Sequence, residues 1–309
     1  MREHVAPFVY YLEVHLLYAS IVCLAAWALT SIKSASATWK YWIWVVTSLN
    51  FVVPLAGFFD RFGASQVSWA RQLGGLDAVG IGVSHNLTAG AVLVGVWITG
   101  TALMLGRLLL RVRADRRYAH AAAESPPASR RSFRVHGVPV RFSGTAQAPS
   151  VEGFVRPNIS LPRGIERVLS KPELNAVLAH EVTHAKRRDN LIGLVHELAL
   201  CGLWFHPLVW LTAFRLALYR ELSCDDSVIE KASGADLVTA LAKLASPPEP
   251  FLLRARASSF ISLRLERLAA AEPQEPCRTA NSLLAVLFGA LLLASILGTI
   301  AHTACCFKI

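Results

Sequence analysis

Four long apolar stretches dominate the pattern of hydrophobic and polar positions along the 309 residues of the chain. Each is close to the roughly 20 residues that a helix needs to cross a bilayer. They cover residues 8–32, 41–59, 89–110 and 280–301. The first stretch is longer than the apolar core of a cleavable signal peptide, so we expect it to stay in the protein. The pattern therefore predicts a multi-pass α-helical membrane protein.

The segment between the third and fourth spans has a different pattern. Residues 133–143 alternate as two short strands around Gly137, and residues 150–161 form a second strand pair that is broken at Pro157. Helical patterns follow these strands. Strands followed by helices favour an α+β domain over residues 133–279, with a small antiparallel sheet.

The first long helix predicted in this domain carries a clear start signal. Ser170 and Glu173 have the spacing of a capping box, and Pro172 lies in the first turn. His180 and His184 lie on the shoulder of the apolar stripe of this helix, whereas a histidine that merely fills the core would lie within the stripe. The stripe has helical spacing and consists of Leu174, Val177, Leu178, Val182 and Ala185.

The sequence His180-Glu181-Val182-Thr183-His184 is an HExxH motif. Its two histidines lie about 40° apart around a helix and about one turn apart along it, so one metal ion can contact both imidazoles. Glu181 lies about 100° further round and can take a proton from a water molecule in the open position of the metal. The motif predicts hydrolytic chemistry, with one Zn²⁺ per chain and Glu181 as the base.

A catalytic zinc ion usually has a third protein ligand and leaves its fourth position to water. The histidine that marks the metzincin peptidases would lie at position 190, which is Asn190 here, so this subclass is excluded. The remaining option is a glutamate on a second helix. The candidates are Glu221 and Glu197, of which Glu197, next to His196, is the weaker because the pair interrupts an otherwise apolar helix.

Pro207 can open that second helix, and the apolar pattern continues to about Lys231. On this helix Glu221 and Asp225 are four residues apart and share a face. Asp225 falls inside the apolar stripe, where a carboxylate needs a partner such as the free ring N–H of a metal-bound histidine. We therefore favour Glu221 as the third ligand, and we expect Asp225 to accept a hydrogen bond from the free ring N–H of a metal-bound histidine.

Composition agrees with a membrane protein. The chain is 54% hydrophobic and 17% charged, against about 25% charged residues in ordinary globular domains, and its mean hydropathy is +0.43. Basic residues mark the cytoplasmic side of a membrane protein, and the densest basic cluster lies at residues 107–117. We therefore expect residues 33–40 and 111–278 in the cytoplasm of a bacterial-type cell, with the N-terminus, residues 60–88 and residues 302–309 outside the inner membrane.

Residues 111–132 are basic at first and then rich in alanine, serine and proline, which is typical of a linker. The net charge of +10 fits this topology and an attraction to anionic lipid headgroups. No nucleic-acid-binding motif accompanies the charge, so we expect the lipid bilayer as a partner and no direct binding of nucleic acid. The six cysteines form neither a metal-binding pattern nor an obvious disulfide framework.

Three segments of the sequence resemble one known family. They are HEVTHAKRRDN, WFHPLVW and YRELSCDDSVI, and the resemblance extends over about residues 133–267, including GFVRPNISLP. The family is that of the BlaR/MecR-type membrane zinc peptidases, the antirepressor half of β-lactam sensor-transducers. The resemblance implies a gluzincin-like metallopeptidase domain. In it the zinc ligands would be His180, His184 and Glu221. The base would be Glu181, and Asp225 would be the supporting carboxylate.

For function, the resemblance implies a membrane-embedded zinc endopeptidase that cleaves a cytoplasmic protein, such as a transcriptional repressor, in signal transduction. The CAAX-processing and HtpX-like membrane peptidases share HExxH followed by ExxxD, so processing or quality control of membrane proteins is the alternative. A noncatalytic signalling scaffold is a second alternative. The presence of Glu181 argues against the scaffold, because a purely structural zinc site has no use for a base.

One strand of the predicted sheet is a candidate for holding the substrate. An extended peptide can add to a free sheet edge by main-chain pairing. The candidate edge strand consists of Val151, Glu152, Gly153, Phe154 and Val155. An ordinary structural strand is the alternative, because the sequence does not show which edge of the sheet is free.

The same resemblance leads to an expectation about sensing. In the sensor-transducers a penicillin-binding domain with an acylatable serine follows the fourth span, whereas residues 302–309 follow it here. No S-x-x-K motif occurs in the segments predicted to face outward. We therefore expect that the chain lacks the sensor domain and is not itself a β-lactam receptor. Control of the peptidase would then come through residues 60–88, the spans or a separate sensor subunit.

Overall fold

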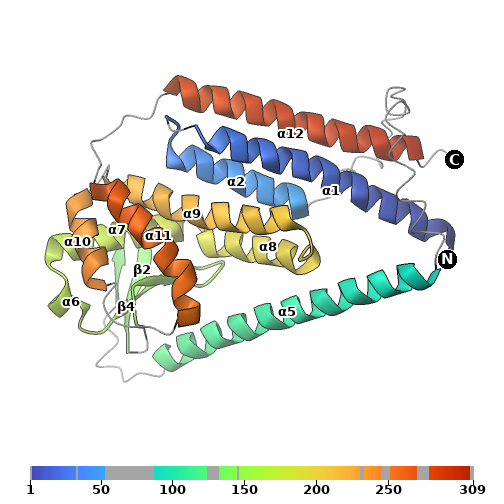
Figure 1. The fold of residues 1–309 in the computed structure, drawn as a ribbon. Coiled ribbons are helices and arrows are strands. Elements are labelled where there is room, and N and C mark those ends of the chain that lie inside the picture. The colour runs from blue at the N-terminus through green and yellow to red at the C-terminus, as the bar shows by residue number, and fades with distance from the viewer. Residues whose placement is uncertain are drawn as a thin grey trace.

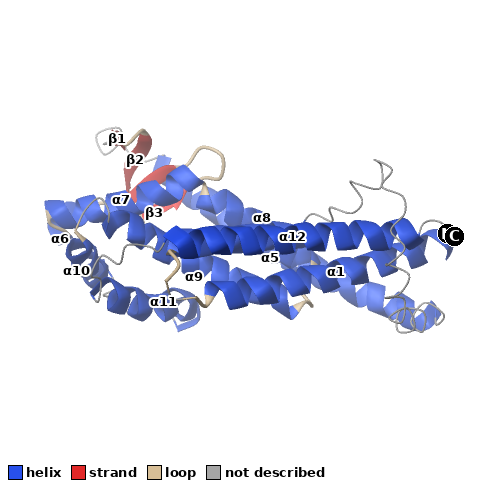
Figure 2. Ribbon diagram, turned by 90° about the horizontal axis from the view of Figure 1, so that it is seen from above, coloured by secondary structure: helices blue, strands red, loops and turns tan. Residues whose placement is uncertain are grey.

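The computed structural model describes residues 2–32, 34–52, 87–123, 132–144, 146–229, 233–244, 251–269 and 278–306. Most of these residues are helical (Figure 1). The strands are confined to one end of the molecule, where shorter helices lie beside them (Figure 2). The long helices extend away from this end.

Three long helices, α1, α2 and α12, lie side by side (Figure 1). Their bounds are Arg2–Thr30, Ala37–Val52 and Arg278–Cys306. A fourth long helix, α5, covers Leu87–Ala123 and packs against α8, which covers Asp189–Gly202. Near this contact Gly100 of α5 lies against the indole ring of Trp204, and a β-carbon there would force the ring to move.

The apolar segment Val92–Ala114 of α5 is the one part of the described chain that is long and apolar enough to cross a membrane. The apolar helices His15–Thr30 and Asn281–Leu297 are shorter. Residues 53–59 of the predicted second span, and the predicted outer segment up to residue 86, lie outside the described residues. The multi-pass arrangement therefore stays a prediction.

Helix α5 continues past its apolar part as far as Ala123. The predicted linker, residues 111–132, is therefore helical over its first part, because alanine and arginine are good helix formers. Residues 124–131, which contain the two prolines, lie outside the described residues.

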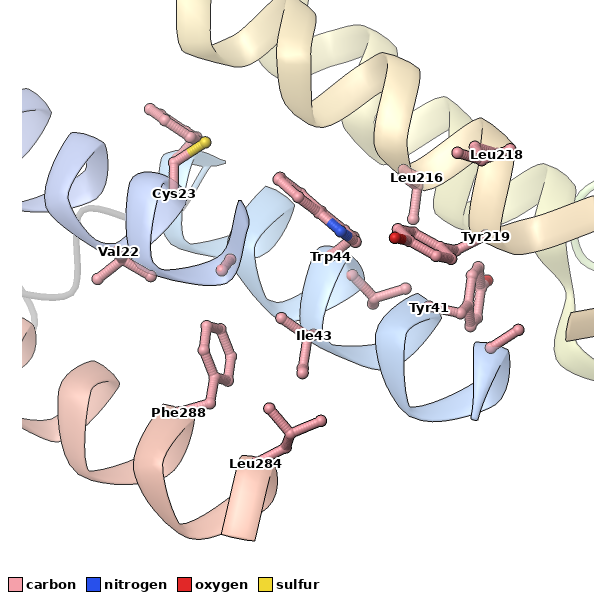
Figure 3. Packing of buried hydrophobic residues seen from close by; sticks show 14 of the residues in the cluster. Val22, Cys23, Tyr41, Ile43, Trp44, Leu216, Leu218, Tyr219, Leu284 and Phe288 are labelled. Atoms are coloured by element: carbon pink, nitrogen blue, oxygen red, sulfur yellow. The ribbon is translucent and has the colours of Figure 1, made fainter. Parts of the chain in front are cut away.

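A buried apolar core joins α1, α2 and α12 to α9, which covers Pro207–Ile229 (Figure 3). Trp44 and Tyr41 of α2 are fully buried at its centre. Burying one large apolar side chain stabilises a fold by roughly 1.5–3 kcal/mol, so this core holds α9 firmly against α2. The residues labelled in Figure 3 are Val22, Cys23, Tyr41, Ile43, Trp44, Leu216, Leu218, Tyr219, Leu284 and Phe288.

The sheet has four strands in the order β1-β2-β4-β3. Their bounds are Ser132–Val135, Val138–Ser143, Ser150–Glu152 and Asn158–Pro162 for β1 to β4. The expectation of a fully antiparallel sheet is wrong, because β2 pairs with β4 in parallel. The chain passes from β2 to the outer strand β3 and then returns as β4 between the two. Strand β4 takes this central place because its side chains Ile159 and Leu161 are completely buried.

The helices of this end of the molecule follow the sequence pattern closely. The capping box of α7 is confirmed, since Ser170 N donates to Glu173 Oε2 at 2.8 Å and Glu173 N donates to Ser170 Oγ at 3.4 Å. The expected pair of helices joined at His206-Pro207 is present as α8 and α9. The remaining helices are α6 at Ile165–Val168, α7 at Lys171–Arg187, α10 at Gly234–Leu244 and α11 at Phe251–Ala269.

Candidate metal centre

Helix α7 places the two histidines of the HExxH motif side by side. The ring centroids of His180 and His184 are 4.7 Å apart, and the two rings meet edge to face. His180 Nε2 lies 3.1 Å from His184 Nε2. The two nitrogen atoms that can bind a metal therefore face the same point.

Helix α9 brings Glu221 to this point. Glu221 Oε2 lies 3.5 Å from His180 Nε2 and 3.8 Å from His184 Nε2. Two ligands held at about 2.05 Å in a tetrahedron around zinc lie about 3.3 Å apart, and the three observed separations bracket that value. His180, His184 and Glu221 therefore fit one zinc ion, and their ligand atoms all lie within 4.8 Å of one another.

The alternative ligand, Glu197, lies elsewhere. It is on α8 and its carboxylate faces Arg111 of α5, with 3.6 Å between the charged atoms. Among the described residues, the acid that joins the HExxH histidines at a single point is Glu221 and not Glu197.

Asp225 lies one turn beyond Glu221 and is almost completely buried. Its Oδ1 atom is 3.1 Å from His180 Nδ1, in an ion-pair contact that is not aligned as a hydrogen bond. Arg264 of α11 donates to both oxygens of this carboxylate, and a third guanidinium nitrogen lies 3.3 Å from Glu221 Oε2. The Asp225 carboxylate therefore contacts His180 and Arg264 at the same time.

Asp189 supports the second histidine through a hydrogen bond. Arg188 takes the left-handed backbone conformation with φ of 56°, which ends α7 and lets α8 begin at Asp189. His184 Nδ1 donates to Asp189 Oδ2 at 2.7 Å. Arg187 also donates to this carboxylate, through Nη2 to Oδ2 at 2.6 Å. Both imidazoles thus contact a carboxylate through Nδ1, which leaves both Nε2 atoms directed at the common point.

The charges of these groups are strongly coupled. Burial alone would lower the pKa of His180, but the carboxylates of Asp225 and Glu221 outweigh it and raise this pKa to about 9. Burial would raise the pKa of Glu221, but the two histidines and Arg220 hold it well below its usual value. The pKa of Asp189 is also lowered, because hydrogen bonds from His184 and Arg187 outweigh its burial. The lowered pKa values keep Glu221 and Asp189 ionised, which is the state that a metal ligand and its supporting carboxylate require.

A cleft of about 440 Å³ runs past these residues, lined by α7, α9, α10 and α11 and by the edge of the sheet at β3. Glu181 lines it together with the two histidines and Glu221. Strand β3, at the edge of the sheet, lines it through Ser150 and Val151. The side-chain amide of Asn190 donates to Val151 O at 2.7 Å, which fixes this edge next to the HExxH helix.

The predicted edge segment, residues 151–155, is only partly a strand. Val151 and Glu152 belong to β3, but Gly153 takes a positive φ of 86° that ends the strand. Phe154 and Val155 lie beyond it.

The chain matches the family described as BlaR1 peptidase M56 over residues 11–236. It belongs to the M56 peptidases. This membership confirms the resemblance to BlaR/MecR-type peptidases that the sequence indicates.

Three relatives of this M56 peptidase illustrate the range of the similarity. "Regulatory protein BlaR1" of Bacillus licheniformis is 29% identical over 173 residues, which cover 53% of this chain and 28% of that protein. "Methicillin resistance mecR1 protein" of Staphylococcus aureus is 21% identical over 143 residues, covering 44% and 24%. "Protease HtpX homolog" of Thermococcus kodakarensis is 34% identical over 88 residues, covering 28% and 29%. The chain therefore matches less than a third of the length of each relative.

Asp189 and Arg264 are among the residues that organise this M56 site and that sequence reasoning missed. Asp189 is part of the HEVTHAKRRDN segment and lies directly after the HExxH helix. This position could have indicated that its carboxylate is close to His184, because a new helix begins there. Arg264 gave no such signal, since it is one of several arginines on α11. Its partner Asp225 is 39 residues away along the chain.

Proposed function

We propose that this M56 peptidase is a membrane-embedded, gluzincin-like zinc endopeptidase that binds one Zn²⁺ through His180, His184 and Glu221. The observation that carries the proposal is the convergence of three ligand atoms from two helices at separations that match one tetrahedral ion. A site of this kind, with three protein ligands and a neighbouring glutamate, is the arrangement of catalytic rather than structural zinc.

A bound zinc ion would polarise the peptide carbonyl and make its water ligand more acidic. The chain supplies the remaining chemistry. Glu181, which lines the cleft, takes a proton from the attacking water and passes it to the amine that leaves. Asp225 and Asp189 hold the two imidazole rings through their Nδ1 atoms, so that neither ring turns away during the reaction.

The cleft beside strand β3 is the proposed substrate site. A substrate in extended conformation would run along β3 and pass over the HExxH helix, because the edge strand and the metal ligands line the same cleft. The free edge of β3 would offer main-chain hydrogen bonds to it, next to the point where the Asn190 amide already donates to Val151 O. Such pairing is independent of substrate side chains, so it favours an endopeptidase that needs an unfolded or flexible segment.

The proposed substrate is a cytoplasmic protein, such as a transcriptional repressor, in a signalling pathway. Two observations support this proposal. The arginines at residues 107–117 lie at and just beyond the C-terminal end of the apolar segment of α5, and they favour a cytoplasmic position for the peptidase end. The similar proteins from Bacillus licheniformis and Staphylococcus aureus carry regulatory and resistance names.

Substrate identification tests the proposal directly. Cells that produce the wild-type chain should contain a soluble regulatory protein with a new N-terminus, and this N-terminus should be absent in cells that produce Glu181→Gln. Glu166→Gln is the matched control, because Glu166 is exposed on α6 away from the cleft. Identical sets of protein N-termini in wild type and Glu181→Gln would contradict the proposal.

Processing of membrane proteins is a second candidate function, and one cavity favours it. This cavity of about 770 Å³ lies among α5, α8, α9 and α11, with Phe214 and Phe260 in its walls. Arg220, Glu221 and Arg264 line both this cavity and the cleft, so the two spaces meet at the metal centre. A substrate could reach the site along α5 from the membrane. The same comparison of N-termini separates the two candidate functions. Processing of membrane proteins requires that the proteins cut in wild-type cells, and left uncut in Glu181→Gln cells, are membrane proteins.

A further inference from the structure

Tyr41 connects a long helix of the bundle to the metal centre. It lies near the start of α2 and is fully buried. Its hydroxyl donates to Asp189 Oδ1 at 2.7 Å. The other oxygen of the same carboxylate, Oδ2, accepts from His184 Nδ1, also at 2.7 Å. One buried carboxylate therefore bridges helix α2 and a metal-binding histidine.

The surroundings of Tyr41 reinforce this bridge. The guanidinium of Arg187 lies over the Tyr41 ring at 4.2 Å from its centroid, and it also donates to both oxygens of Asp189. The same guanidinium donates to Arg220 O on α9, next to Glu221. The ring, the carboxylate and the guanidinium thus form one packed unit at the junction of α2, α7, α8 and α9.

Other polar groups on α2 have a different kind of partner. Trp44 Nε1 donates to Thr30 Oγ1, and Thr47 Oγ1 donates to the carbonyl of Ile43. Ser48 pairs with His196. A buried tyrosine needs one acceptor, and such local acceptors would satisfy it. Tyr41 instead bonds to the carboxylate that orients His184.

We propose that Tyr41 is a positioning residue of the metal centre, which acts through Asp189 to orient His184 and so ties zinc affinity to the position of helix α2. The inference rests on the proposed zinc site. Loss of a partner behind a metal ligand typically lowers metal affinity by about 10–100-fold. Arg187 still holds Asp189 when the tyrosine hydroxyl is removed, so the expected effect of Tyr41→Phe is at the lower end, about tenfold.

The experiment measures Zn²⁺ affinity of the full chain in detergent by competition with a chelating indicator. Tyr41→Phe should weaken Zn²⁺ binding about tenfold, and it should alter the visible absorption spectrum of the Co²⁺-loaded protein, which reports ligand geometry. Asp189→Asn should weaken binding further. Adding Tyr41→Phe to Asp189→Asn should cause no additional loss, because the tyrosine acts only through that carboxylate.

Two control variants remove buried hydroxyl groups elsewhere in the same core. Tyr219→Phe makes the same chemical change at a tyrosine whose hydroxyl donates to Thr30 O at 3.1 Å. Ser48→Ala removes a hydroxyl from α2 itself. Both should keep wild-type Zn²⁺ affinity and an unchanged Co²⁺ spectrum, even if they lower the melting temperature of the metal-free protein as much as Tyr41→Phe does.

Three results would overturn the inference. Wild-type Zn²⁺ affinity in Tyr41→Phe would remove its positioning role. Equal weakening in Tyr41→Phe and Tyr219→Phe would assign the effect to the core in general. Full additivity of Tyr41→Phe and Asp189→Asn would show that the tyrosine acts by another route. A wild-type chain that binds no Zn²⁺ is a distinguishable outcome, since it would overturn the proposed function as well.

Discussion

Arg264 and Asp225 form a buried two-point contact in which Arg264 Nε and Nη2 each donate to one carboxylate oxygen at 2.8 Å. Because Asp225 also contacts His180, this pair joins α11 to the back of the metal centre. The geometry is that of a planar guanidinium matched to a carboxylate, which lysine cannot reproduce. The contact makes α11 part of the site although no residue of α11 is a proposed ligand.

Replacing Arg264 with methionine should destabilise the metal-free protein by about 3–5 kcal/mol, because it leaves the buried Asp225 without its main partner. Arg267→Met is the matched control on the same helix. The Arg267 side chain is 40% exposed and pairs with Asp226 at 2.6 Å, so its loss should cost about 1 kcal/mol or less. Chemical unfolding of the two variants checks the difference. Equal losses would show that the Arg264 contact is no stronger than a surface pair.

Zinc analysis tests the ligand set. The purified chain should contain about one zinc ion, and alanine at His180, His184 or Glu221 should each lower the zinc content, since three protein ligands are usual for catalytic zinc. Glu181→Gln should keep the zinc and lose proteolysis. Glu197→Ala is the control for the alternative ligand and should keep the zinc. Full zinc occupancy in Glu221→Ala would give the ligand role to another residue.

The HExxH helix and the helix with Glu221 and Asp225 were predictable because their signals are local. Capping residues and a stripe of helical spacing locate α7 and its histidines, and the four-residue spacing places Glu221 and Asp225 on one face of α9. The structure brings the three expected ligand residues together at one point. Local periodicity was sufficient to predict these two helices and the faces on which these side chains lie.

The contacts behind the ligands were not predictable, because each joins segments that are distant in sequence. Tyr41 and Asp189 are 148 residues apart, and Arg264 is 39 residues from Asp225. The parallel pairing of β2 with β4 has a similar origin. Alternation of side chains shows that a segment is a strand, but it does not show which strand becomes its neighbour.

The ion pair of Glu173 with Lys243 predicts a response to acid. Hydrogen bonds from Lys243 and from Ser170 N hold the pKa of Glu173 below its usual value. A carboxylate whose folded pKa is lowered adds stability above its unfolded pKa, about 4.3, and this stability is lost as the pH falls through the folded pKa. Stability of the α7–α10 contact should therefore decrease on acidification below about pH 4.3.

Glu173→Gln should make the metal-free protein less stable at neutral pH and reduce this acid-dependent loss, because glutamine can still accept from Ser170 N but carries no charge for Lys243. The measurement is the free energy of unfolding at a series of pH values with a chelator present. Glu166→Gln, at an exposed position on α6, should leave the wild-type pH profile unchanged. A Glu173→Gln profile parallel to wild type would remove Glu173 from the acid response.

The position of the peptidase end relative to the membrane is tested by fusions of reporter proteins. A reporter that is active only in the cytoplasm should work when fused after Arg117 and should fail when fused after Gly75. The reason is the series of arginines at residues 107–117, which lies at and just beyond the C-terminal end of the apolar segment of α5 and resists transfer across the membrane. Replacing these arginines with glutamine should weaken the preference, since the charge and not the sequence sets the orientation. Activity of a periplasmic reporter after Arg117 in the unaltered chain would place the metal centre outside the cell, where it could not reach a cytoplasmic repressor.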